Sequence, residues 1–173
     1  MDAGACILNT IQGTNPPIRL LKMARNYNAA IVLMHMRGTP QTMQTGIHYQ
    51  DVIVEIISAL GRSIEKCLEA GIKADKIIID PGIGFGKTAG HNLEILDRLN
   101  DFATLRRPLL IGTSRKSFIG AILNKDVGQR LFGTAATVCA SILNGAHIVR
   151  VHDVKAMKDI AQMTDAIVNA SQS

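Results

Sequence analysis

The chain contains no tryptophan, and its 173 residues include only two tyrosines and four phenylalanines. It also has no run of lysines and arginines, so nucleic acid is a poor candidate partner. A core with so few aromatic side chains consists of isoleucine, leucine, valine and alanine, which suits helices packed on a parallel sheet. The net charge of +5 then favours a small anionic substrate.

Cysteines and long apolar segments are scarce as well. The three cysteines, Cys6, Cys67 and Cys139, lie far apart, and no CxxC motif or cysteine–histidine cluster occurs. This pattern predicts reduced thiols and no zinc site. No apolar run approaches the length of a membrane span, and the first ten residues do not resemble a signal peptide. We therefore expect a cytoplasmic protein with neither membrane nor nucleic acid as a partner.

The stretch Ile77–Lys87, IIIDPGIGFGK, joins an apolar strand to a carboxylate and a glycine loop. Its three isoleucines predict a strand that is buried on both faces. Asp80 comes at the carboxyl end of this strand, which is where α/β proteins bind their ligands. The alternative role for Asp80 is to cap the helix expected near His91. The final Gly–Lys–Thr resembles a P-loop, but Pro81 stands where that motif requires glycine.

Short apolar runs alternate with helical patterns five times along the chain. The predicted strands are Ala5–Asn9, Ala30–Met34, Ile77–Ile79, Pro108–Ile111 and Ala146–Val151. The clearest predicted helices are Asp51–Ala70 and Leu93–Phe102. Strands joined by helical crossovers run parallel, which predicts an α/β fold.

Every predicted strand ends in polar residues. They are Asn9, His35, Asp80, the Ser114–Ser117 loop, and Arg150 with His152. A doubly wound sheet needs chemistry only near its switch point, whereas all strand ends of a barrel meet at one mouth. We therefore predict a partial (β/α) TIM-barrel type, with about five of the eight strand–helix units.

The loop GTSRKS holds two adjacent cations, Arg115 and Lys116, at the start of a predicted helix. Ser114 is expected to cap that helix. A helix start with these cations predicts an anion site, although a solvated basic turn is the alternative.

Arg150 and His152 lie two residues apart on the last predicted strand, so both are expected on one face. Burying both there is costly without an anion. A salt bridge to Asp153 or Asp80 is the alternative.

Four blocks of this sequence together resemble bacterial dihydropteroate synthases. They are LMHMRGTPQTMQ at Leu33–Gln44, DPGIGFGK at Asp80–Lys87, GTSRKSFIG at Gly112–Gly120 and RVHDV at Arg150–Val154. The resemblance implies a cytoplasmic, pterin-binding TIM barrel of the folate pathway that is a homodimer in the family. It also implies condensation of (7,8-dihydropterin-6-yl)methyl diphosphate with 4-aminobenzoate, which releases diphosphate and uses Mg²⁺.

The resemblance assigns one group of residues to the pterin. The residues that match Asn9, Asp80 and Lys116 hold the ring, and the match of Met34 lines its slot. Phe85, in the glycine loop, is also expected to bind substrate.

The resemblance assigns a second group of residues to the diphosphate and to 4-aminobenzoate. The matches of Arg150 and His152 hold the diphosphate, and that of Ser117 meets the carboxylate of 4-aminobenzoate. Lys116, Arg150 and His152 are therefore the expected catalytic residues. The resemblance places the Mg²⁺ ligand outside this chain.

The chain departs from the family pattern in two ways. Thr10 stands where an aspartate usually follows the asparagine, and the sequence starts at what resembles the fourth barrel strand. We therefore expect residues 1–173 to form a single, incomplete pterin-binding domain that is weakly stable, self-associating and inactive alone.

Two other functions remain open. One is a pterin-dependent methyltransferase-type domain, although a methyl donor needs no diphosphate site of the GTSRKS kind. The other is a non-catalytic fragment or subunit that needs a partner chain.

Overall fold

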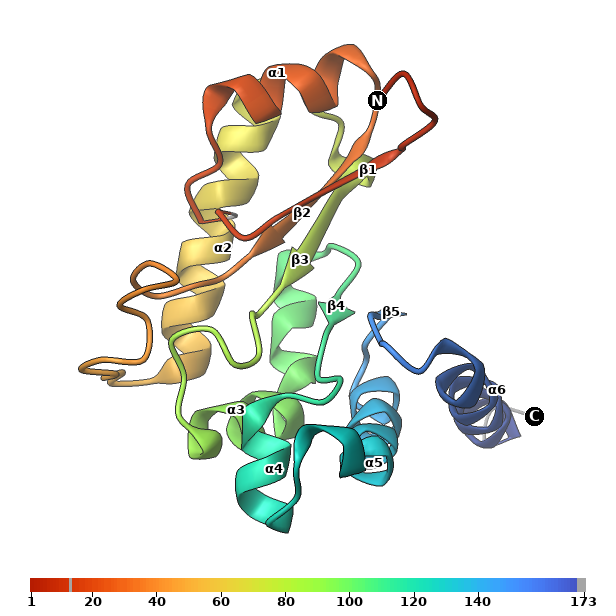
Figure 1. Ribbon diagram of the computed structural model, residues 1–173. Helices are drawn as coiled ribbons and strands as arrows, with labels where there is room; N and C mark the ends of the chain where they lie inside the picture. Colours follow the sequence, from red (N-terminus) through yellow and green to blue (C-terminus); the bar gives the residue numbers. More distant parts are fainter. Residues whose placement is uncertain (13, 171–173) are drawn as a thin grey trace.

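The computed structural model describes residues 1–12 and 14–170, in which strands and helices alternate (Figure 1). The strands are β1 (Ile7–Thr10), β2 (Ala30–Met34), β3 (Ile77–Asp80), β4 (Leu110–Ile111) and β5 (Ile148–Val149). All pairings are parallel: β1, β2 and β3 form one sheet, and β4 pairs with β5. A single bridge between Ile79 and Leu109 joins the two sheets.

The strand register separates two faces, because paired residues point to the same side and successive residues alternate. One face carries the large core, in which Ile31, Leu33, Ile77 and Ile79 are fully buried. The other carries a smaller cluster of Val32, Ile78 and Leu110. We call this second side the inner face. It also carries Asn9 and Asp80, because Asn9 pairs with Val32 and Asp80 pairs with Met34.

The part of the chain that the structure describes also contains six α-helices. They are α1 (Ile18–Asn26), α2 (Val52–Glu69), α3 (Ala89–Asp97), α4 (Ser117–Leu123), α5 (Leu131–Leu143) and α6 (Val154–Ala170). The helix predicted over Asp51–Ala70 is confirmed as α2. The Asp51 side chain caps it by accepting hydrogen bonds from the N–H groups of Ile53 and Val54 at 2.9 and 3.0 Å.

The helix predicted over Leu93–Phe102 is wrong in its bounds. The α-helix begins at Ala89, because the Thr88 side chain caps it, and it ends at Asp97. A 3₁₀ helix then covers Leu99–Leu105, so the apolar run belongs to two elements with different periods. The last two strands are likewise shorter than the predicted Pro108–Ile111 and Ala146–Val151.

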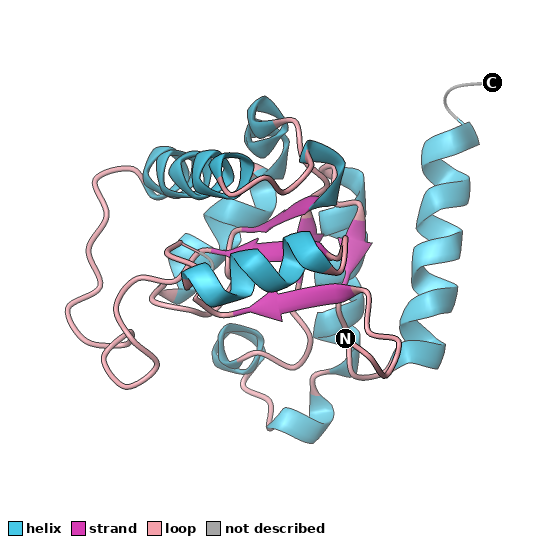
Figure 2. Ribbon diagram, turned by 90° about the horizontal axis from the view of Figure 1, so that it is seen from above, coloured by secondary structure: helices cyan, strands magenta, loops and turns pink. Residues whose placement is uncertain are grey.

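The outermost strands, β1 and β5, each pair with one neighbour among the described residues. Figures 1 and 2 show the strands with helices around them, and α6 packs against α5 at the C-terminal end of the chain. These features fit a barrel wall that is open along two edges. Among the described residues, no helix is long and apolar enough to cross a membrane.

Candidate functional site

Asp80 ends β3 on the inner face and is only 5% exposed. Its carboxylate accepts a hydrogen bond from the Gly82 N–H at 2.7 Å. Burial raises the pKa of this carboxyl group, and the Gly82 N–H and the charges of Lys116, Lys87 and Arg150 oppose the rise. The alternative role as a helix cap is wrong, because Thr88 caps α3.

The glycine loop after Asp80 lies directly against the end of β2. Gly82 has a φ of +70°, and a Cβ on it would collide with the carbonyl oxygen of His35. A Cβ on Gly86 would lie 2.7 Å from the carbonyl oxygen of Arg37. The Tyr49 hydroxyl also donates to the Gly86 carbonyl at 2.9 Å. Only glycine permits this close packing of two backbones.

Lys87 turns into the protein rather than to solvent. It is 3% exposed, and its Nζ lies 3.0 Å from His35 Nδ1 and donates to the Phe85 carbonyl at 3.0 Å. Burial lowers the pKa of Lys87 to about 7, against the opposing attraction of Asp80. Burial and the Lys87 charge lower the pKa of His35 to about 3, so this imidazole stays neutral.

Lys116 reaches across the mouth from the loop after β4. Its Nζ donates to the Ile83 carbonyl and lies 4.6 Å from the centre of the Phe85 ring. Burial lowers the pKa of Lys116 to about 8, Asp80 raises it, and Arg150 lowers it further. Lys116 therefore lies against Phe85, and it is close enough to Asp80 for the two charges to affect each other.

A small cavity of about 100 Å³ lies beside Lys116. Its lining consists of Gly112, Ser114, Lys116, Arg150, Val151 and His152. The three predicted catalytic residues are thus neighbours. The prediction that Arg150 and His152 are buried is wrong, since both are exposed. The strand ends at Val149, so Val151 lines the same cavity instead of facing away.

The loop after β4 differs from its predicted form. Ser114 does not cap α4; its buried hydroxyl contacts His152 instead. Arg115, at a φ of +55°, pairs with Asp153 with 3.0 Å between Nε and Oδ2. This pair occupies Asp153, and none of the ion pairs found among the described residues includes Arg150.

The remaining predicted residues lie around this group. Met34 is buried and pairs in register with Asp80. Asn9 pairs in register with Val32, one layer below them on the inner face, and is exposed. Ser117 is the exposed first residue of α4, and it does not line the small cavity.

Sequence reasoning missed the roles of two residues, His35 and Lys87. The sequence carries a signal for His35, because His35 directly follows a buried strand, as the glycine loop follows Asp80. The inward turn of Lys87 has no sequence signal, because it depends on how the loop folds over β2.

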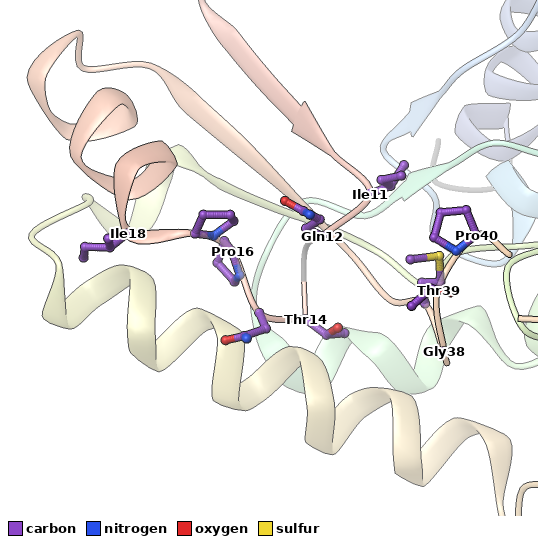
Figure 3. A pocket seen from close by; sticks show the side chains of 11 residues that line it. Ile11, Gln12, Thr14, Pro16, Ile18, Gly38, Thr39 and Pro40 are labelled. Carbon is purple, nitrogen blue, oxygen red and sulfur yellow. The ribbon is translucent and has the colours of Figure 1, made fainter. Parts of the chain in front are cut away.

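A larger hollow of about 680 Å³ lies between the segment after β1 and the loop after β2. Figure 3 shows Ile11, Gln12 and Pro16 on one side of it and Gly38, Thr39 and Pro40 on the other. None of its lining residues is charged, and none is a predicted site residue. Size alone therefore does not mark the functional site here.

The described residues do not suit a magnesium ion. No group of three histidine, cysteine, aspartate or glutamate side chains within residues 1–12 and 14–170 is placed to hold a metal. The strand-end carboxylate, Asp80, is surrounded by the cations Lys116, Lys87 and Arg150 instead. A cation would have to displace these charges.

The fold and the mouth together define a partial α/β barrel whose strand ends combine one buried carboxylate with several cations. The family model described as pterin binding enzyme matches residues 1–152. The chain belongs to this family, and the resemblance and the partial TIM-barrel fold predicted from the sequence are confirmed.

Known dihydropteroate synthases are similar to the chain over almost all of its length. The enzyme of Synechocystis sp. is 45% identical over 168 residues, which are 96% of this chain and 58% of that protein. A Yersinia pestis dihydropteroate synthase structure with a sulfonamide drug complex has a TM-score of 0.94 at 37% identity. It matches 98% of this chain and 61% of that one.

The Thermus thermophilus dihydropteroate synthase has been solved in complex with 6HMPPP and with 4-aminobenzoate. Both structures give a TM-score of 0.90 at 34% identity over 96% of this chain, and 66% and 68% of theirs. This chain spans about three fifths of the length of the curated relatives it matches.

Proposed function

We propose that this chain is part of a dihydropteroate synthase and carries its pterin and diphosphate sites. The whole enzyme condenses (7,8-dihydropterin-6-yl)methyl diphosphate with 4-aminobenzoate to give 7,8-dihydropteroate and diphosphate. The observation that carries the proposal is the meeting of buried Asp80 with Lys116, Arg150 and His152 at one mouth.

The pterin binds beside Asp80 in this proposal. A carboxylate accepts hydrogen bonds from a ring N–H and an adjacent amino group, which a pterin offers side by side. Lys116 donates to the ring carbonyl, and Asn9 adds an amide partner from β1. Met34 and Phe85 supply apolar contact with the flat ring. The inner-face positions of Asn9, Met34 and Asp80 support this arrangement.

The diphosphate binds at Arg150 and His152, and 4-aminobenzoate binds with its carboxylate at Ser117. An exposed guanidinium with no ion-pair partner among the described residues is free to make two parallel hydrogen bonds to a phosphate. The ligand-bound Thermus thermophilus structures support both substrates at the level of the relatives.

The reaction breaks the bond between the pterin methylene carbon and the diphosphate oxygen, and its electron pair leaves with diphosphate. The amine nitrogen of 4-aminobenzoate then forms the new bond to the methylene carbon and loses a proton to solvent water. Arg150 balances the charge on the departing group, His152 donates a hydrogen bond to it, and Lys116 orients the ring. The protein supplies position and electrostatics.

Four further properties belong to this proposal. Residues 1–173 are one pterin-binding domain, and the whole enzyme is a cytoplasmic homodimer. Mg²⁺ would be held by ligands outside this chain, as the family resemblance implies, and no cluster of three or more histidine, cysteine, aspartate or glutamate side chains among the described residues is placed to hold it. We therefore assign no step to the metal here.

The Asp80→Ala variant tests the pterin site directly. A buried charge-assisted pair contributes roughly 2–3 kcal/mol, so pterin affinity should fall by about 30- to 150-fold. The measurement is calorimetry in a barrel completed with the remaining part of the Synechocystis relative. Asp75→Ala, in the 3₁₀ helix before β3, is the matched control and should bind normally. Unchanged affinity in Asp80→Ala would show that the pterin lies elsewhere.

A further inference from the structure

The buried hydroxyl of Ser114 contacts His152 twice. Ser114 is 6% exposed, and its Oγ accepts the backbone N–H of His152 at 3.1 Å. The same Oγ lies 2.9 Å from His152 Nδ1. The first contact has a fixed direction, because a backbone N–H only donates. The second has two possible directions, which depend on the imidazole tautomer.

The count of donors and acceptors decides between them. The Ser114 hydroxyl has one hydrogen to donate, and the structure gives it no partner among the described residues other than His152. If Nδ1 carried the proton, two N–H groups would point at Oγ and the hydroxyl hydrogen would have no acceptor among the described residues. Leaving such a donor unpaired is costly. The hydroxyl therefore donates to Nδ1.

We propose that Ser114 is a positioning residue that holds the neutral His152 imidazole with its proton on Nε2, ready to donate to a phosphate oxygen. A neutral imidazole carries one N–H, so the tautomer decides whether the nitrogen that is free of Ser114 donates to an anion or repels it. The phosphate part of this inference rests on the proposed function.

Other charged groups surround this ring. Arg150 and Lys116 line the same cavity and attract the same anion. Asp153 follows His152 in the chain, but Arg115 pairs with it and balances its charge. The fixed N–H therefore adds to an already cationic site. It lets His152 act as a donor without taking up a second proton.

The proposal is tested by measuring the tautomer of His152. Nitrogen NMR of the histidine rings in the 173-residue chain shows which ring nitrogen carries the proton. The wild-type spectrum, recorded where His152 is neutral, should show Nδ1 unprotonated and Nε2 protonated. A wild-type ring with its proton on Nδ1 overturns the proposal, whatever the chain binds.

The Ser114→Ala variant should shift the ratio of the two tautomers toward Nδ1–H by roughly two- to tenfold, the size of one net hydrogen bond. Ser114→Thr keeps the hydroxyl and should restore the wild-type ratio. Thr113→Val removes the adjacent buried hydroxyl, which contacts Thr137 rather than His152, and should change nothing. An unchanged ratio in Ser114→Ala overturns the proposal.

His147 provides an internal control in the same spectra. Its Nδ1 accepts the Leu109 N–H at 3.2 Å, so its proton also lies on Nε2 and should stay there in every variant. If the tautomer ratios of both histidines change in Ser114→Ala, the substitution has altered the fold. The proposal is then decided by the tautomer of His152 in the wild-type and Ser114→Thr spectra.

Titration with inorganic pyrophosphate connects the tautomer to binding. Ser114→Ala should bind roughly threefold or more weakly where the ring is neutral, and about normally where both nitrogens are protonated. If Ser114→Ala weakens pyrophosphate binding equally with the neutral ring and with the doubly protonated ring, the tautomer is not the cause. A wild-type chain that has the expected tautomer but binds no pyrophosphate would count against the proposed function and leave the role of Ser114 in the tautomer intact.

Discussion

At the scale of single residues, the ionisable side chains at the mouth fall into a buried set and an exposed set. Asp80, Lys87 and the neutral His35 are buried, whereas Arg150 and His152 are exposed and line the small cavity. Changes to the buried residues should therefore affect the stability of the fold as well as the site. The exposed residues, Arg150 and His152, are free to bind an anion.

The Arg150→Lys variant separates the diphosphate site from the pterin site. Lysine keeps the charge but cannot reproduce the two parallel hydrogen bonds of a guanidinium. Binding of the pterin diphosphate should therefore weaken by about tenfold more than binding of the free pterin alcohol, as measured by calorimetry on both ligands. Equal losses for the two ligands would show that Arg150 does not act on the diphosphate.

His35 should make the fold sensitive to acid. Its pKa is lowered to about 3 in the folded chain and has an ordinary value of 6.5. The unfolded chain therefore binds more protons between these values, so stability is full above pH 6.5 and declines as the pH falls toward 3. The loss is about 1.4 kcal/mol per pH unit.

Urea unfolding at pH 7 and at pH 5 measures this loss. His35→Gln should reduce the difference between the two pH values by roughly 2 kcal/mol, because glutamine does not titrate. His48→Gln changes an exposed histidine and should keep the wild-type difference. If His35→Gln and the wild type respond equally to acid, His35 is not the group that titrates.

At the scale of elements, the glycine loop and the end of β2 form one packed unit. Tyr49, Lys87 and the glycines hold the two loops together, and Lys116 binds the same loop from the other side. The geometry of the mouth therefore depends on close backbone contact at a few glycines.

Gly82→Ala should disturb this unit more than a change at another glycine of similar conformation. Both Gly82 and Gly46 have a positive φ, +70° and +63°, but a Cβ at Gly46 meets nothing within 4 Å. Gly46→Ala should therefore cost only about 1–2 kcal/mol of unfolding free energy. Gly82→Ala adds a collision with His35 and should cost more than about 3 kcal/mol. If urea unfolding shows the same loss of unfolding free energy for Gly82→Ala and Gly46→Ala, the glycine loop can move to accommodate the Cβ at Gly82.

The sequence predicted some elements almost to the residue because local and tertiary signals agree there. Strands β2 and β3 are continuous apolar runs that are buried on both faces, and α2 has a capping aspartate at its start. The bounds of α3 were missed because a 3₁₀ helix continues its apolar pattern. The pairing of Arg115 with Asp153 was missed because it depends on a left-handed backbone at Arg115.

At the scale of the whole molecule, the five parallel strands of the described residues form a wall with open edges. Residues of β1 such as Ile7, which is 51% exposed, lie at one edge, and β5 lies at the other. A closed barrel of this type has about eight strands. Unpaired apolar edges favour association with other strands, so the isolated chain is expected to self-associate.

Release of diphosphate tests the central claim most directly: these 173 residues carry the pterin and diphosphate sites but form only part of the barrel. The purified chain receives both substrates and Mg²⁺, alone and together with the remaining part of the Synechocystis relative. We predict no release by the chain alone, and turnover in the completed barrel that Asp80→Ala abolishes. Steady turnover by a monomer of the chain alone would contradict the account.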